Sequence, residues 1–318
     1  MKTILLVLIM LVAVPARADE ANAVLTKARG AWTLGAGRTS GNLTIYPILS
    51  SSADPERRYV SLDDAMGKNS VRVSEVGGGD VPTLHLVNKS KDPLFIMTGE
   101  LLAGAKQDRI SAHDVLLDPT LKNVALSVYC VEAGRWRGNS NRFAAGYGTA
   151  TKGVRRSAAL KAPQGEIWQH VAAKSAAAKV YSPTGTLRAV MEDGDVRQST
   201  ERYLAALLSL AADNEVMIGF VATIDGEVSS ADVFTNRPLF TALWPKLLRT
   251  VAIDAATPTR GNRKSELGAE AFLAAGIAGR MRALPNPGLG KEYKIEGEIS
   301  GSMLVADGTL VHLALFSK

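Results

Sequence analysis

The amino-acid sequence predicts an α+β fold: an antiparallel β-rich N-terminal half, sandwich or barrel-like, then helices, a late hairpin and a C-terminal meander. Short runs rich in β-branched residues, separated by turn signals, fill the region before residue 131. Apolar residues at helical spacing become common only after residue 163. Asp225-Gly226 separates two apolar runs and is the clearest hairpin signal, because both turn positions require positive φ. Strands and helices are therefore segregated along the chain, which favours α+β over a doubly wound sheet.

The β-rich half follows a segment at 22–36 that is expected to be a short helix or an irregular arm. Strands are expected at 43–49, 71–76, 83–87, 94–98, 110–117 and 124–131. A short helix is expected at 61–66, where Ser61 can cap the first turn and Asp64 stands three residues on, as in an acidic capping box. Strands this short and closely spaced are typical of antiparallel sandwiches and barrels.

The second half combines helices with two antiparallel units. Helices are expected at 164–180, 197–211, 238–254 and 265–282, with Asn236 and Ser265 as caps of the last two. Pro245 lies inside the third of these and predicts a kink or a later start. The hairpin joins 217–224 to 227–234, and a three-stranded meander at 293–316 is expected to turn near residues 300–301 and 307–308.

Residues 1–18 have the pattern of a signal peptide. Lys2 precedes an apolar run at 5–14 that is too short to span a hydrocarbon core of ~30 Å. Pro15 breaks the run, and Ala16-Arg17-Ala18 supplies small residues before a cut near Ala18. We therefore expect an exported mature chain of 300 residues, periplasmic or secreted, without a transmembrane segment. It would comprise an N-terminal arm at 19–42 and a single α+β domain at 43–318.

The bulk composition is that of a globular chain with a mild positive charge. Hydrophobic residues make up 46% of the sequence, which suffices for a large core. The formal net charge is +6, and it is +4 once Lys2 and Arg17 are removed with the leader, so an anionic partner is permitted but not required. Cys130 is the only cysteine, which excludes an internal disulfide. We expect it to be a small buried apolar residue, with a reactive thiol as the alternative.

A basic segment at 137–163 separates the two halves. It contains no acidic residue, and we expect a mobile basic loop there. Phe143 and Tyr147 could stack on the bases of a nucleic acid or act with the cations on another polyanion. A solvated segment explains the composition more simply, and export makes nucleic acid an unexpected partner. The cations of the segment are Arg137, Arg142, Lys152, Arg155, Arg156 and Lys161.

The densest polar motif is Gly99-Glu-Leu-Leu-Ala-Gly-Ala-Lys-Gln-Asp-Arg109. Glu100 could act as a general base or hold a cation. Lys106, Gln107 and Arg109 could bind an anion, since an arginine fork suits phosphate or carboxylate. The alternative is an exposed turn whose charges are only solvated. The spacing of the glycines and the absence of Gly-Lys-Ser/Thr exclude a phosphate loop of the P-loop type.

A second motif is Tyr129-Cys-Val-Glu-Ala-Gly-Arg-Trp136. On a strand, Cys130 and Glu132 project to the same face, and Arg135 and Trp136 follow at the end of that strand. Glu132 is a second candidate base, and Arg135 and Trp136 are candidate ligand contacts, although Trp136 could equally cover the core. No cofactor fingerprint, nucleophile elbow or metal-ligand spacing is present, so neither a cofactor nor a metal is expected.

Both motifs occur together with Ala231-Asp-Val-Phe, Leu239-Phe and Leu243-Trp-Pro-Lys-Leu-Leu248. In this combination the chain resembles the domain family associated with ADP-ribosylglycohydrolases and rhodanese-phosphatases, largely a domain of unknown function, over residues 43–256. The resemblance implies that the polar residues of both motifs belong to one pattern and lie near one another. It implies no established reaction, and the family's name connects it with ADP-ribose or nucleotide-phosphate processing only by association.

Two functional hypotheses follow. The first is an exported binding protein that holds an anionic small molecule or polymer in a polar pocket formed by the two motifs. The second is a hydrolase or transferase acting on a phosphate- or ribose-containing substrate, with Glu100 or Glu132 as general base and nearby cations stabilising developing negative charge. A purely structural role for the charges is the third possibility. The substrate and the oligomeric state are left open.

Overall fold

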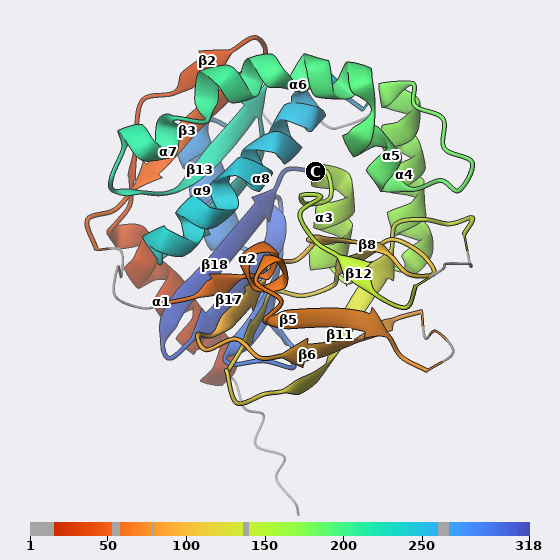
Figure 1. Cartoon of the computed structure of the whole chain (residues 1–318). Coiled ribbons are helices and arrows are strands. Elements are labelled where there is room, and N and C mark those ends of the chain that lie inside the picture. The colour runs from red at the N-terminus through yellow and green to blue at the C-terminus, as the bar shows by residue number, and fades with distance from the viewer. Residues whose placement is uncertain (1–15, 53–57, 78, 80, 136–139, 260–266) are drawn as a thin grey trace, which may run out of the picture.

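The computed structural model describes residues 16–52, 58–77, 79, 81–135, 140–259 and 267–318, and Figure 1 shows their arrangement. Strands and helices pack as an α+β molecule whose sheets are antiparallel apart from one short parallel pair, β4 with β7. The predicted fold class is thus confirmed. Within the described residues no helix is long and apolar enough to cross a membrane.

The largest sheet has nine strands, in the order β1-β3-β13-β14-β18-β17-β16-β15, with β2 also paired to β3. In this sheet β3 pairs with β13 of the predicted hairpin. The C-terminal strands β15 to β18 extend the sheet from the other side of the hairpin, where β18 pairs with β14. Asp225 and Gly226 both have positive φ at the β13–β14 turn, as expected for this hairpin type. The strands are Thr33–Leu34 (β1), Arg38–Ser40 (β2), Leu43–Leu49 (β3), Met217–Ile224 (β13), Glu227–Phe234 (β14), Arg280–Leu284 (β15), Lys291–Glu296 (β16), Ser300–Ala306 (β17) and Thr309–Phe316 (β18).

A six-stranded sheet in the order β12-β8-β9-β11-β6-β5 forms a second unit. A bridge between Ser74 of β5 and Arg142, just before β12, brings its two edges together and nearly closes it as a barrel. A three-stranded sheet, β10-β7-β4, packs against it. The strands are Val60–Ser61 (β4), Val71–Glu75 (β5), Thr83–Asn88 (β6), Leu94–Ile96 (β7), Leu101–Gly104 (β8), Arg109–Ser111 (β9), Val115–Leu117 (β10), Asn123–Cys130 (β11) and Phe143–Ala144 (β12).

The helices cover both faces of the large sheet and one side of the barrel (Figure 1). One core lies between the sheet and α6 and α8, a second between its opposite face and α1 and α9, and a third between the barrel and α3, α4 and α5. The helices are Ala16–Gly30 (α1), Leu62–Gly67 (α2), Lys152–Ala159 (α3), Gln164–Ala178 (α4), Leu187–Glu192 (α5), Gly194–Leu207 (α6), Leu210–Asp213 (α7), Arg237–Ala256 (α8) and Ala269–Ile277 (α9).

Two predicted caps are confirmed. The Ser61 hydroxyl accepts the Asp64 N–H at the start of α2, and Asn236 accepts the Leu239 N–H at the start of α8. Pro245 does not delay α8, which begins at Arg237 and runs through the proline, so the predicted later start is wrong. The Ser265 cap lies outside the described residues.

Three other predictions differ from the structure. The basic segment is not one loop, because α3 occupies Lys152–Ala159 and β12 occupies Phe143–Ala144. The single strand expected at 110–117 is divided into β9 and β10, since Asp114 turns inward to accept the Thr98 N–H. The helix expected to reach residue 282 ends at Ile277, and the following residues form β15 against β16. Local periodicity does not reveal these pairings, which depend on distant parts of the chain.

Candidate functional site

Asp108 and Glu132 from the two motifs lie together, and we call them with Arg135, Arg188 and Thr186 the Asp108 cluster. Arg135 donates to Glu132 through Nε at 2.9 Å and through a terminal nitrogen at 2.7 Å, the bidentate geometry of a strong ion pair. Asp108 accepts from the Thr186 hydroxyl at 2.6 Å and from Arg188 Nε at 3.0 Å. Its backbone N–H donates to Glu132 at 2.9 Å. The structure thus brings Asp108 of the first motif to Glu132 and Arg135 of the second, and their charges satisfy one another.

The contacts fix the ionisation of this cluster. Burial alone would raise the pKa of the Glu132 carboxyl, but the hydrogen bonds from Arg135, Thr184 and the Asp108 N–H, together with the charge of Arg135, outweigh it and hold that pKa below its usual range. The same pairing with Glu132 raises the pKa of Arg135. Glu132 thus remains an ionised, fully engaged carboxylate, which makes it a weak proton acceptor.

Glu100 lies in a separate group with Lys246 of α8 and Asp63 of α2, the Glu100 cluster. Its side chain is 1% exposed, accepts the Met97 N–H at 2.9 Å and forms an ion pair with Lys246. Lys246 also pairs with Asp63 at 2.6 Å. Burial raises the pKa of Glu100, with Lys246 opposing and Asp63 adding to the shift. No hydrogen bond or ion pair between described residues connects Glu100 directly to Glu132.

The remaining predicted site residues lie around β9 and the end of β11. Arg109 is fully buried opposite Cys130, and its guanidinium donates to the side-chain amide oxygen of Gln107 at 3.0 Å. Cys130 is buried, and burial raises the pKa of its thiol, so it has the character of an inert core thiol. The Lys106 N–H donates to Glu75 at 3.2 Å. Trp136 lies outside the described residues.

A cleft of about 460 Å³, which we call the α6–α8 pocket, lies between the two clusters. On one side it is lined by Lys246 and Asp63, the partners of Glu100. On the other it is lined by Tyr147 and Glu192, and both contact Arg188 of the Asp108 cluster. The lining also includes Arg197 and Arg249, for which no ion pair or hydrogen bond of the side chain is recorded within the described part of the chain.

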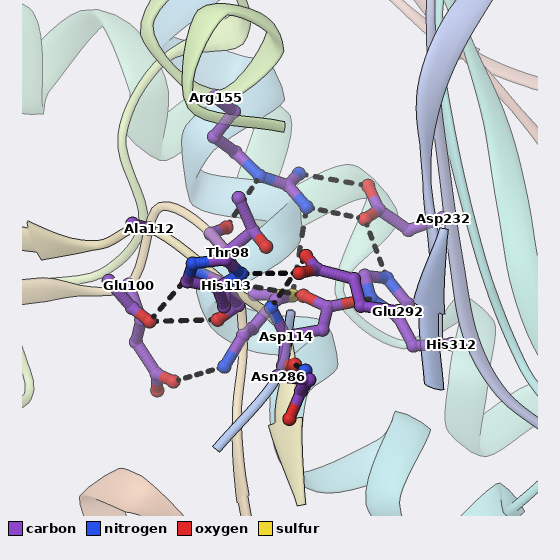
Figure 2. A network of polar contacts seen from close by, with 12 residues as sticks. Thr98, Glu100, Ala112, His113, Asp114, Arg155, Asp232, Asn286, Glu292 and His312 are labelled. Atoms are coloured by element: carbon purple, nitrogen blue, oxygen red, sulfur yellow. Dashed lines mark hydrogen bonds and ion pairs between the residues drawn. The ribbon is translucent and has the colours of Figure 1, made fainter. Parts of the chain in front are cut away.

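A separate buried network joins the large sheet to α3 and to the turn between β9 and β10, and Figure 2 shows it at close range. Arg155 of α3 donates two hydrogen bonds to Asp232 of β14, at 3.0 and 2.6 Å. His312 of β18 contacts Asp232 at 3.1 Å through Nε2 and Asp114 at 2.6 Å through Nδ1. The Asp114 N–H donates to Glu292 at 3.2 Å. We call these five residues the central network.

Protonation of His312 would balance Arg155 and His312 against Asp114 and Asp232, while Glu292 is paired with Lys161 at 3.1 Å. Burial would lower the pKa of His312, but Asp114 and Asp232 outweigh it and raise that pKa to about 9. Burial would likewise raise the pKa of Asp232, but Arg155 and His312 hold it well below its usual range. Gly99 of the first motif adopts a φ of +84°, and a Cβ there would lie 2.5 Å from Arg155 Cγ. The motif glycine is therefore required for Arg155 to reach Asp232.

The comparison with known families confirms the resemblance found in the sequence. A family model described as the ARG and Rhodanese-Phosphatase-superfamily-associated Protein domain, ARPP-1, matches residues 31–316. The chain belongs to the ARPP-1 family. The match runs from just before β1 to the end of β18, so the ARPP-1 domain includes the three sheets, the α6–α8 pocket and the central network. No curated protein and no solved structure matches the chain.

Sequence reasoning missed most of the polar groups that organise this ARPP-1 domain. Lys246 and Asp232 belong to segments on which the family resemblance rests. That resemblance is the one sequence feature that could have identified them. The composition predicts a solvated loop around Arg155, whereas this residue is 3% exposed. Nothing local marks Arg197 or Arg249, because their relation to the pocket depends on how α6 and α8 pack. Among the described residues, no group of three or more His, Cys, Asp and Glu side chains is placed to hold a metal ion.

Proposed function

We propose that this ARPP-1 protein binds an anionic small molecule in the α6–α8 pocket, through Arg197 and Arg249. The observation that carries the proposal is the charge of the lining. Lys246 is balanced by Glu100 and Asp63, and Glu192 is 3.6 Å from Arg188. Within the described part of the chain, the side chains of Arg197 and Arg249 form no ion pair. An anion bound in the pocket could therefore pair with both of these cations.

The dimensions of the pocket favour a small ligand over a polymer. A volume of about 460 Å³ lies within the range of sites for small molecules, roughly 300–1,000 Å³. Arg249 follows Lys246 by three residues on α8, so both project from one side of that helix. Tyr147 adds an aromatic ring, against which Arg188 already lies with its guanidinium carbon 5.6 Å from the ring centre. A planar anion, such as a phosphorylated or carboxylated ring compound, would match this combination.

A hydrolase or transferase has weaker support from the same contacts. Glu132 is ionised and held by Arg135, and Glu100 lies behind Lys246 rather than in the lining of the pocket. Of the two carboxyls, Glu100 is the better candidate because burial raises its pKa toward the range useful for proton transfer. If the pocket supports turnover, replacing Glu100 with Gln would reduce it, whereas replacing Glu132 with Gln would act mainly on stability.

Binding is tested by calorimetric titration with phosphate, nucleotides, sugar phosphates and dicarboxylates. For any anion that binds, replacing Arg249 with Gln is expected to weaken affinity about 10- to 150-fold, because a charge-assisted hydrogen bond is worth about 1.5–3 kcal/mol. Replacing Arg197 with Gln should have a similar effect. Arg72 is an exposed arginine on β5, and replacing it with Gln is the matched control, which should leave affinity unchanged. Equal losses in all three variants, or no binding by any anion, would contradict the proposal.

We also propose that the chain acts outside the cytoplasm, as the pattern of residues 1–18 predicts. A cut after Ala18 would remove the first residues of α1 and keep its buried residues Ala21 and Leu25. Cell fractionation followed by intact-mass measurement should find a mature chain that starts at Asp19. A full-length chain confined to the cytoplasmic fraction would contradict this.

A further inference from the structure

A second cleft, of about 710 Å³, lies away from both motif clusters, between α3, α4, the β13–β14 turn and the end of the chain. We call it the Lys152 cleft. Its lining shares no residue with the α6–α8 pocket. The residues that matter for its chemistry are Lys152, His170, Asp225, Glu227, Asp254 and Ser317.

Lys152 is an unusual lysine because its amine has a neutral partner. Its Nζ donates to the Ser317 hydroxyl at 2.7 Å, and no carboxylate is recorded within ion-pair distance of it among the described residues. Asp254, the nearest acid of α8, instead accepts the Lys152 backbone N–H at 2.9 Å and pairs with Lys174 at 2.6 Å. The amine is thus mostly buried without a countercharge of its own, beside a cavity large enough for a small ligand.

The surrounding charges determine the protonation of this amine. Burial lowers the pKa of Lys152 to about 8, with Asp254 and Glu227 opposing the shift and Arg156 and Lys174 adding to it. At pH 7 about a tenth of the amine would be uncharged, against well under a thousandth for an ordinary lysine of pKa ~10.4. An uncharged, desolvated amine is the form in which lysine attacks carbonyl carbons.

His170 lines the same cleft as this amine. Its ring packs on the residue after Lys152 so closely that a Cβ on Gly153 would lie 2.7 Å from His170 Nδ1. Burial lowers the pKa of His170, which leaves the imidazole neutral near pH 7 and able to carry a proton. A nucleophilic amine and a neutral imidazole on adjoining helices are the groups that imine formation uses.

The charge of the lining selects the class of ligand. Asp254 and Lys174 pair with each other, and the lining then holds two carboxylates, Asp225 and Glu227, against the one amine of Lys152. An anion would therefore be repelled, in contrast to the arginine-lined α6–α8 pocket. A neutral carbonyl compound is not repelled by these carboxylates.

The geometry points to the Lys152 cleft as a second site, which takes a small uncharged aldehyde or ketone and binds it covalently as an imine on Lys152 Nζ. The amine lone pair forms a bond to the carbonyl carbon, and a proton moves from nitrogen to the carbonyl oxygen to give a carbinolamine. Loss of that hydroxyl as water then forms the C=N bond. The sum is amine plus carbonyl giving imine plus water, without an oxidant or reductant.

The test is reductive trapping on the wild-type protein. Propanal and sodium cyanoborohydride at pH 7 convert any imine to a stable propyl-lysine, and peptide mass mapping gives the rate at each lysine. We expect Lys152 to react at least about tenfold faster than exposed Lys68 and Lys179, from its larger uncharged fraction. Its rate should reach half its maximum near pH 8. In urea, Lys152 should lose its advantage over the exposed lysines.

Two outcomes would overturn the inference. One is labelling of Lys152 in the folded protein at or below the rate of Lys68 and Lys179. The other is a ratio of the Lys152 rate to the Lys179 rate that is the same with glyoxylate, an anionic aldehyde, as with propanal. The acidic lining should lower this ratio for glyoxylate. A Lys152→Arg variant keeps the positive charge and should lose the trapped adduct, which confirms the assignment of the peptide.

Discussion

Replacing Asp232 with Ala is expected to lower the free energy of unfolding by about 3–5 kcal/mol, the usual cost of removing one partner from a buried ion pair. Asp232 is fully buried and accepts hydrogen bonds from Arg155 and His312. Without it, Arg155 would keep a buried charge whose remaining hydrogen bonds go to the Thr98 carbonyl and the Met97 sulfur, beside the ring of Phe316. The loss is measured by urea denaturation monitored by tryptophan fluorescence.

The control for this substitution is Asp213→Ala. Asp213 pairs with Arg38 at 2.9 Å, but both side chains are more than 40% exposed. Exposed pairs contribute about 0–1 kcal/mol, so the control should stay close to the wild type. Similar losses in both variants would show that the central network does not hold the sheets together as described.

The second large effect is a fall in stability of about 2 kcal/mol between pH 6.5 and 8. The folded protein raises the pKa of His312 from 6.5 to about 9. The stability gained from the protonated ring is therefore complete below pH 6.5 and is lost as pH rises toward 9, by about 1.4 kcal/mol for each pH unit. Asp232 and Asp114 have lowered pKa values, so their contribution is lost only in acid, below the usual range of aspartate.

The upper limit of pH 8 avoids an opposing contribution. The pKa of Lys152 is lowered from 10.5 to about 8, so folding gains stability from that residue as pH rises above 8. His312→Gln should flatten the profile between pH 6.5 and 8, whereas His85→Gln, on half-buried β6, should keep the fall. If His312→Gln does not fold, the His312 ring can be titrated by NMR in the wild type, with an expected midpoint near pH 9. Constant stability from pH 6.5 to 8 would contradict the protonated state of His312.

The sequence predicted the elements whose pattern is local. Leu43–Leu49, Met217–Ile224 and Glu227–Phe234 form strands at the predicted bounds, because apolar periodicity and the Asp-Gly turn determine them without distant contacts. The α3 helix is not predicted, because its basic residues are typical of a solvated loop. In the structure Arg155 reaches Asp232, 77 residues further along the chain. A buried charge is recognisable from sequence only when its partner is known.

The candidate site shows the same division. The two motifs were identified by composition, and Asp108, Glu132 and Arg135 do lie together. These residues are hydrogen-bonded to one another, which the sequence does not show. The candidate ligand site is therefore the pocket beside them. The pocket cations, Arg197 and Arg249, come from helices that meet only in the folded chain.

The central claim, that the α6–α8 pocket holds an anion between Arg197 and Arg249, is tested most directly by anomalous diffraction. Crystals of the wild-type protein grown with tungstate, a heavy tetrahedral anion, should show an anomalous peak in this pocket within ion-pair distance of Arg249. The same peak should be absent from crystals of the Arg197→Gln, Arg249→Gln double variant grown in the same conditions. An empty α6–α8 pocket in wild-type crystals that bind tungstate elsewhere would contradict the account.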